Sequence, residues 1–100
     1  MIIYAKYNED DNYFDVIYVP NSPEIDFEHR QKMFFEWLFD KNNNHEYWRN
    51  IDGEKTYCEY DVEAFVKWLN TDAYCSVSDK AKVLMKNVFQ DIGDSEVLIF

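Results

Sequence analysis

The dipeptide Asp52–Gly53 is the feature that most narrows what this chain can fold into. It interrupts the stretch EYWRNIDGEKTYCEY, whose flanks are rich in aromatic residues. A two-residue type I′ turn needs positive φ at both central positions, which Asp and Gly accept more readily than most residues. The stretch therefore predicts a β-hairpin that turns at residues 52 and 53.

A second hairpin is predicted at the N-terminus. Residues 1–7 and 13–19 alternate in the manner of strands, and residues 8–12 join them as a loop. The side chains predicted to share one face are Ile3, Ala5, Tyr7, Phe14, Val16 and Tyr18. The other face, which carries Tyr4, Lys6, Asp15 and Ile17, is expected to be half polar.

Three helices are expected between and after the hairpins. Ser22 is the candidate N-cap of the first helix, which should start at Pro23 and run to about Asp40. Asp61 is expected to cap a second helix over DVEAFVKWLN, and Ser78 a third over SDKAKVLMKNVFQ. The residues at core spacing in these two helices are Val62, Phe65, Val66, Leu69, Ala81, Leu84, Met85 and Val88.

The first helix is apolar over more than one face from Met33 onward. Such a helix is wedged between layers or faces a partner. If Phe35 and Phe39 are buried, this part of the helix belongs to the core; if they are exposed, it could form the seam of a dimer. The chain is therefore expected to be either a monomer or a weak dimer.

The expected order of elements defines the fold class. Residues 91–95 are predicted to form a turn, and the final VLIF a buried strand. The prediction is an α+β fold, with a small antiparallel sheet built from two hairpins and a C-terminal strand, packed against three helices. A chain of 100 residues, of which 47% are hydrophobic, is expected to form a single domain over residues 1–100.

No motif in the sequence predicts catalysis or a cofactor. The two glycines are too few for either phosphate-binding glycine loop. The stretch NEDDNYF lacks the Gly and Glu that an EF-hand loop needs at its sixth and twelfth positions. Glu54 and Lys55 are adjacent, so in a strand they point to opposite faces and do not build a shared nuclease site. We expect no catalytic, cofactor-binding or metal-binding residues, and a small carboxylate enzyme remains only an alternative.

Several features predict a cytoplasmic protein. Cys58 and Cys75 lack CxxC spacing and do not form the disulfide framework of a small secreted protein. Residues 1–11 do not have the pattern of a signal peptide. No apolar run reaches the length of a membrane span, so no membrane association is expected.

The formal net charge of −10 indicates what kind of partner is plausible. Direct binding of nucleic acid or of an anionic membrane is not expected, because both are negatively charged. A basic protein would be attracted. Many small acidic proteins are nevertheless acidic only for solubility, and that interpretation has about equal weight.

Acidic residues gather on turns and element ends beside aromatic residues of the predicted strands. Aromatic side chains anchor interfaces and charge steers encounter, so this pattern is typical of a surface that binds a basic protein. The residues predicted to bind the partner are Glu9, Asp10, Asp11, Tyr13, Asp15, Tyr47, Trp48, Asp52, Glu54, Tyr57, Glu59, Asp61 and Glu63. An equally good interpretation is that the aromatic residues form the core and the acids solvate its edge.

The chain begins with the strand-like MIIYAKYN, has an acidic first turn, is rich in Tyr, Phe and Trp, and ends in VLIF. In these respects it resembles the small acidic immunity proteins of contact-dependent growth inhibition and other polymorphic toxin systems. Proteins of that class bind a cognate toxin domain, often a basic nuclease, and block its active site or a neighbouring surface. The resemblance implies an immunity protein whose partner is such a domain.

A rival hypothesis explains the same features. Phage-type acidic inhibitors and DNA mimics are similarly short, and they block host nucleic-acid-binding proteins such as CRISPR effectors or restriction nucleases. A mimic is expected to space its carboxylates along one face as phosphates are spaced. A structural domain with incidental charge is a further alternative.

Overall fold

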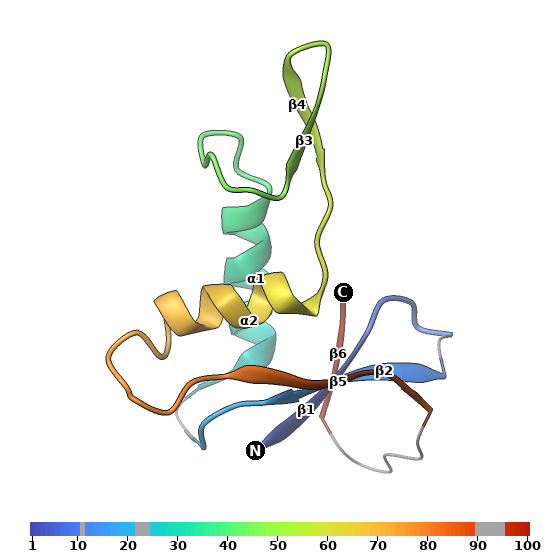
Figure 1. Cartoon of the computed structure of the whole chain (residues 1–100), viewed down its shortest axis with the longest axis vertical. Helices are drawn as coiled ribbons and strands as arrows, with labels where there is room; N and C mark the ends of the chain where they lie inside the picture. Colours follow the sequence, from blue (N-terminus) through green and yellow to red (C-terminus); the bar gives the residue numbers. More distant parts are fainter. Residues whose placement is uncertain (11, 22–24, 90–95) are drawn as a thin grey trace.

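Two helices and six strands make up the described part of the computed structural model, which covers residues 1–10, 12–21, 25–89 and 96–100. The strands form a four-stranded sheet and a separate two-stranded hairpin (Figure 1). The α+β class is therefore confirmed, but the described residues contain two helices where three were predicted.

The main sheet has the strand order β5-β2-β1-β6. β1 (Ile2–Lys6) and β2 (Tyr13–Tyr18) form the predicted N-terminal hairpin. β5 (Lys82–Phe89) pairs antiparallel with β2, whereas β6 (Val97–Ile99) runs parallel to β1. The C-terminal strand is confirmed, and the sheet is mixed, not purely antiparallel as predicted.

The faces of the N-terminal hairpin differ from the prediction. Ile3 pairs with Ile17 and Ala5 pairs with Asp15. Residues directly opposite each other in an antiparallel ladder share a face. The inner face therefore carries Asp15 and Ile17, and both are buried. The prediction that Ile3 and Ala5 share a face with Phe14, Val16 and Tyr18, and that Asp15 and Ile17 lie on the other face, is wrong.

The first helix, α1 (Phe27–Leu38), starts later than predicted. Its N-cap is Asp26, whose carboxylate accepts hydrogen bonds from the backbone N–H groups of Glu28 at 3.1 Å and His29 at 3.3 Å. These bonds satisfy N–H groups that have no partner inside the helix, so Asp26 fixes where the helix begins. The predicted cap Ser22 lies outside the described residues.

The second helix, α2 (Val62–Thr71), is confirmed together with its cap. The Asp61 carboxylate accepts a hydrogen bond from the Glu63 backbone N–H at 3.0 Å. The core positions predicted for this helix are buried, namely Val62, Phe65, Val66 and Leu69.

The predicted third helix is wrong, because most of that segment forms β5. Leu84 and Met85, predicted to face the core, are 46% and 52% exposed. A strand places successive residues on opposite faces, so these neighbours cannot both point inward. The turn predicted over residues 91–95 lies outside the described residues.

The Asp52–Gly53 hairpin forms as predicted but stands apart from the main sheet (Figure 1). It consists of β3 (Trp48–Ile51) and β4 (Glu54–Cys58). Asp52 has φ 53° and Gly53 has φ 81°, as a type I′ turn requires. The prediction that both hairpins share one sheet is wrong.

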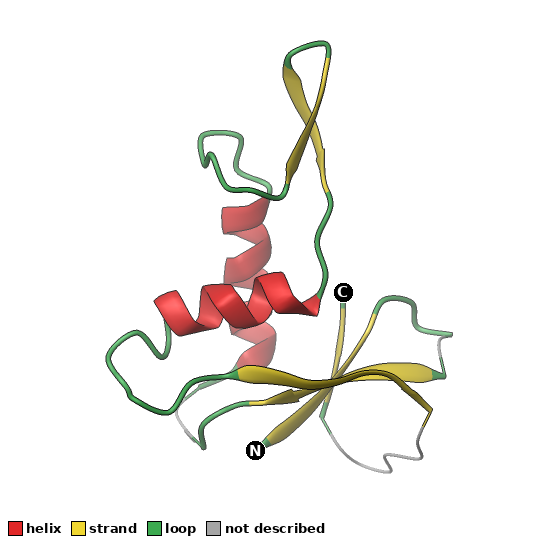
Figure 2. Cartoon of the chain, in the orientation of Figure 1, coloured by secondary structure: helices red, strands yellow, loops and turns green. Residues whose placement is uncertain are grey.

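The core lies between the helices and the inner face of the main sheet (Figure 2). Phe34 of α1 is fully buried, and its ring centroid lies 5.4 Å from that of Phe65 in α2. Phe35 is partly buried against this core, while Phe39 is 51% exposed. The apolar second half of α1 therefore serves mainly as core, with Phe39 at the surface.

Candidate protein-binding surface

The predicted acidic groups lie on two separate tips of the molecule. Glu9 and Asp10 belong to the β1–β2 loop, and both are exposed. Asp52 and Glu54 are exposed at the β3–β4 turn, at the far end of the molecule from that loop (Figure 1). Asp11 lies outside the described residues. The structure therefore does not unite the predicted acids in one patch.

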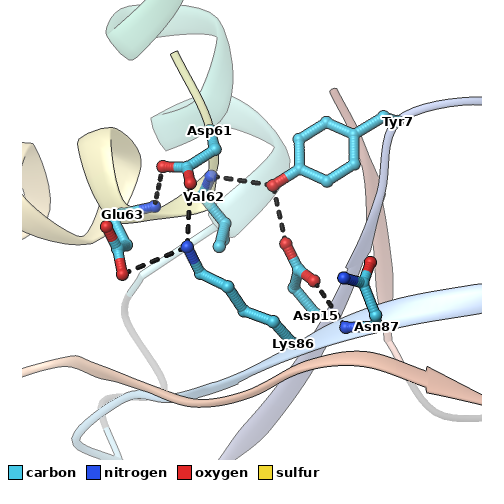
Figure 3. A network of polar contacts seen from close by, with 7 residues as sticks. All are labelled: Tyr7, Asp15, Asp61, Val62, Glu63, Lys86 and Asn87. Carbon is cyan, nitrogen blue, oxygen red and sulfur yellow. Dashed lines mark hydrogen bonds and ion pairs between the residues drawn. The ribbon is translucent and has the colours of Figure 1, made fainter.

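Three of the predicted acids are engaged by cations of the chain itself. Glu59 Oε2 lies 3.0 Å from Arg49 Nε. Lys86 Nζ lies 2.9 Å from Asp61 and 3.1 Å from Glu63 (Figure 3). The hydrogen bonds that the Lys86 ammonium donates to these two carboxylates raise the pKa of Lys86. Because cations of the chain pair with them, these three acids attract a basic partner less strongly than the sequence predicts.

The carboxylates at the two tips, unlike those of Glu59, Asp61 and Glu63, are not paired with a cation of the described residues. Within the described residues, no Lys or Arg lies within ion-pair distance of Glu9, Asp10, Asp52 or Glu54. The Lys6 ammonium donates to the Glu9 backbone carbonyl at 2.8 Å, not to its carboxylate. The tips therefore present anionic groups directly to solvent.

Among the predicted acids that the structure describes, Asp15 alone is buried, at 5% exposure. Its carboxylate accepts hydrogen bonds from the Tyr7 hydroxyl at 2.7 Å and from the Asn87 backbone N–H at 3.1 Å. The Tyr7 hydroxyl in turn accepts a hydrogen bond from the Val62 N–H at 2.9 Å (Figure 3). This network ties β2 and β5 to the start of α2.

The Tyr7 hydroxyl remains protonated at neutral pH. Burial raises its pKa first, and the hydrogen bond to Asp15 raises it further. Tyr7 is therefore a hydrogen-bond donor to Asp15 and not a candidate general base.

A pocket of about 360 Å³ opens beside this network and is lined by Tyr7, Tyr13, Asp15 and Asn87. Tyr13 is 58% exposed, and its ring centroid lies 5.6 Å from that of Phe89. The sequence identified Tyr13 and Asp15 as site residues but not Tyr7 or Asn87. Asn87 could not be predicted as a site residue, because it reaches the pocket only through the pairing of β5 with β2. No local sequence pattern reveals that pairing.

The β3–β4 hairpin has an anchored base and an exposed outer face. Trp48 is half-buried, and its indole N–H donates to the Asn43 carbonyl at 2.9 Å. The Lys55 ammonium donates to the Lys41 carbonyl at 2.5 Å. Ile51 and Tyr57 are 55% and 47% exposed. Tyr57 is thus available to a partner, whereas Trp48 serves mainly to hold the hairpin.

A second cleft of about 270 Å³ lies between the two helices and the segment before β3. Its lining residues are Trp37, His45, Glu46, Tyr47, Ala64, Lys67, Trp68 and Thr71. Glu46 forms an ion pair with Lys67 at 2.8 Å, and that hydrogen bond lowers the pKa of Glu46. Tyr47, predicted to bind the partner, forms part of this cleft. Its aromatic walls suit a planar apolar group.

The described residues contain no cluster of three or more His, Cys, Asp or Glu side chains able to hold a metal ion. Cys58 and Cys75 are free thiols, and burial raises the pKa of Cys58. In the part of the chain that the structure describes, no helix is long and apolar enough to cross a membrane.

Comparison of the chain with protein-family models, curated proteins and solved structures found no match. The resemblance to immunity proteins therefore remains a prediction, and a functional interpretation must come from the surface itself.

Proposed function

We propose that this chain is a non-enzymatic immunity protein that binds and neutralises a basic toxin domain, with a nuclease domain as the expected partner. One observation carries the proposal: both hairpin tips present carboxylates without a cation of the chain at ion-pair distance, among the described residues. A formal net charge of −10 adds a long-range attraction for a basic partner.

Exposed apolar side chains beside the acids supply the short-range part of such an interface. Tyr13 follows the acidic β1–β2 loop, and Ile51 and Tyr57 belong to the hairpin that carries Asp52 and Glu54. Buried aromatic anchors contribute most of the binding energy of an interface, whereas charge at its rim mainly speeds association. The tips therefore combine the two features that a fast, tight inhibitor needs.

The arrangement of the acids supports contacts with a protein more than mimicry of DNA. A mimic needs carboxylates at regular intervals along one face. Glu9 and Asp10 lie on one tip, Asp52 and Glu54 on another, and Asp61 and Glu63 share Lys86. No observation on the described residues favours the mimic as a second candidate.

The proposal is tested with the toxin domain that we expect to be encoded directly upstream of the gene for this chain. We expect co-expression of the chain to restore growth of cells that produce the toxin. The association rate of the purified proteins should fall by about tenfold or more when NaCl is raised from about 0.02 M to about 0.5 M, because salt screens exposed charges.

A pair of charge-matched variants isolates the first tip. Glu9→Gln with Asp10→Asn should slow association, while Glu28→Gln with Glu36→Gln on exposed positions of α1 removes the same charge and should slow it less. Equal effects of the two pairs would show that only net charge matters. An association rate indifferent to salt and to both pairs would refute the proposal.

A further inference from the structure

The Asp15 carboxyl group is buried, and no cation of the described part of the chain pairs with it. It is 5% exposed, and its two hydrogen-bond donors, Tyr7 and the Asn87 backbone N–H, are neutral. No Lys or Arg of the described residues lies within ion-pair distance of it. Burying a carboxylate without a counter-charge is costly, so a cation that pairs with it offsets that cost.

The carboxylate also has acceptor capacity left. An ionised carboxyl group offers about four lone-pair sites over its two oxygens. Its two hydrogen bonds use one oxygen each, Oδ2 for Tyr7 and Oδ1 for Asn87. Asp15 lines the pocket beside this network, so a donor entering the pocket reaches the remaining sites.

The pocket has the size and the walls for a single cationic side chain. Its volume of about 360 Å³ lies near the lower end of the roughly 300–1,000 Å³ typical of ligand sites. Two of its lining residues, Tyr7 and Tyr13, are aromatic, and a cation over an aromatic face is favourable. Asn87 is also a lining residue, and an asparagine side chain can both donate and accept hydrogen bonds.

The charges around the pocket attract a cation. Asp61 lies near enough to Tyr7 to act on its hydroxyl electrostatically. Lys86, the nearby cation, is shared by Asp61 and Glu63, which leaves one negative charge in excess among the three groups (Figure 3). Glu9 and Asp10 lie in the loop between β1 and β2, which also carries Tyr7 of the pocket.

We propose that the pocket lined by Tyr7, Tyr13, Asp15 and Asn87 receives an arginine side chain of the basic partner. The inference rests on the proposed function and names the anchor of that interface. A guanidinium is planar, stacks on aromatic rings and is less strongly hydrated than an ammonium, so it suits an aromatic pocket with a buried carboxylate better than lysine does. It donates to Asp15 while its plane lies against the tyrosine rings.

The test uses the whole chain and a small probe. N-acetyl-arginine amide is titrated into the ¹⁵N-labelled protein, and amide chemical shifts are followed. We expect shifts centred on Tyr7, Tyr13, Asp15 and Asn87. The neutral isostere N-acetyl-citrulline amide should bind at least tenfold more weakly, and N-acetyl-lysine amide also more weakly. Equal binding of arginine and citrulline, or no shifts at these residues, would overturn the inference.

Variants identify the groups that bind the probe. Asp15→Asn should weaken arginine binding at least tenfold, but Asp15 also orders the network, so this variant can lose stability. Tyr13→Ala leaves the Asp15 hydrogen bonds in place and should weaken binding several-fold. Phe39→Ala, which removes an exposed aromatic ring at the end of α1 far from the pocket residues in sequence, is the control and should have no effect. Equal effects of the two alanine variants would contradict the pocket.

Failure of this inference is distinguishable from failure of the proposed function. If the basic partner binds Tyr13→Ala as tightly as the unaltered chain, the pocket is not its anchor although the function stands. If arginine binds the pocket but no basic toxin domain is neutralised, the pocket stands as a cation site and the proposed function falls.

Discussion

Tyr7 is the residue at which the main sheet, the second helix and the buried carboxylate meet. Its hydroxyl donates to Asp15 at 2.7 Å and accepts from the Val62 N–H at 2.9 Å. Val62 is the first residue of α2, where backbone N–H groups have no partner within the helix. One hydroxyl therefore satisfies both a helix terminus and a buried anion.

Tyr7→Phe should lower the free energy of unfolding by about 1–3 kcal/mol, because it leaves a part-buried N–H and a buried carboxylate short of a partner. The measurement is urea denaturation at neutral pH. Tyr57→Phe removes the same atom from an exposed tyrosine and should change stability by less than about 0.5 kcal/mol. Equal values for the two variants would mean that the network is not structurally important.

Alkaline pH should destabilise the protein through the same residue. The pKa of Tyr7 is raised above its ordinary value of 10.0 in the folded state by burial and by Asp15. Above pH about 10 the unfolded chain therefore releases a proton that the folded chain retains, so stability falls as pH rises, whereas below pH about 10 Tyr7 has no effect on the pH dependence. Burial raises the pKa of Tyr60 and Tyr74 in the same direction.

The measurement is the urea midpoint between about pH 8 and about pH 11. Tyr7→Phe should retain a decline, because Tyr60 and Tyr74 still titrate, but a shallower one than the unaltered chain. A slope that Tyr7→Phe leaves unchanged would contradict the assignment.

The stability of the β3–β4 hairpin depends mainly on contacts close to the hairpin itself. The hairpin pairs with no strand of the main sheet, and its base is held by hydrogen bonds of Trp48 and Lys55 to the loop after α1 and of Cys58 to the Leu38 carbonyl. Regions with few packing contacts open without unfolding the whole domain. The tip that carries Asp52 and Glu54 is therefore expected to open more readily than the core.

Gly53→Ala should destabilise the hairpin alone. Gly53 has φ 81°, a conformation that costs a residue with a side chain about 1–2 kcal/mol, and no atom lies within 4 Å of an added Cβ. The whole cost is therefore backbone strain. Amide hydrogen exchange should accelerate in β3 and β4 and stay unchanged in β1 and β2. Uniform acceleration would show that the hairpin and the sheet unfold together.

Elements with a strong local signal could be predicted from the sequence, and elements fixed by distant pairing could not. Asp52–Gly53 and the cap Asp61 act within a few residues of themselves, and both predictions are confirmed. Residues 82–89 carry apolar residues at spacings that fit a helix as well as a strand, and pairing with β2 decides the outcome. The burial of Asp15 also depends on distant partners, since Tyr7 and Asn87 come from other segments.

At the scale of the whole molecule, the carboxylates divide into two kinds. Some form surface ion pairs with lysines of the chain, as Glu46 does with Lys67 and Glu63 with Lys86. Others, such as Glu9 and Asp10, add repulsion to a chain of formal charge −10 without a compensating ion pair among the described residues. Repulsion of this kind destabilises a compact state, while the same charges favour solubility and attract a basic partner.

Removing the two kinds of carboxylate should therefore affect stability differently. Glu9→Gln with Asp10→Asn and Glu46→Gln with Glu63→Gln both make the net charge less negative by two. At low ionic strength the first pair should keep or raise the urea midpoint, because it only relieves repulsion. The second pair should give a lower midpoint than the first, because the same relief of repulsion is offset by the loss of two weakly stabilising surface ion pairs. At about 1 M NaCl the Debye length is about 3 Å, so the difference between the pairs should shrink. If the first pair lowers stability as much as the second, the acids of the β1–β2 loop support the fold, and their presence no longer points to a basic partner.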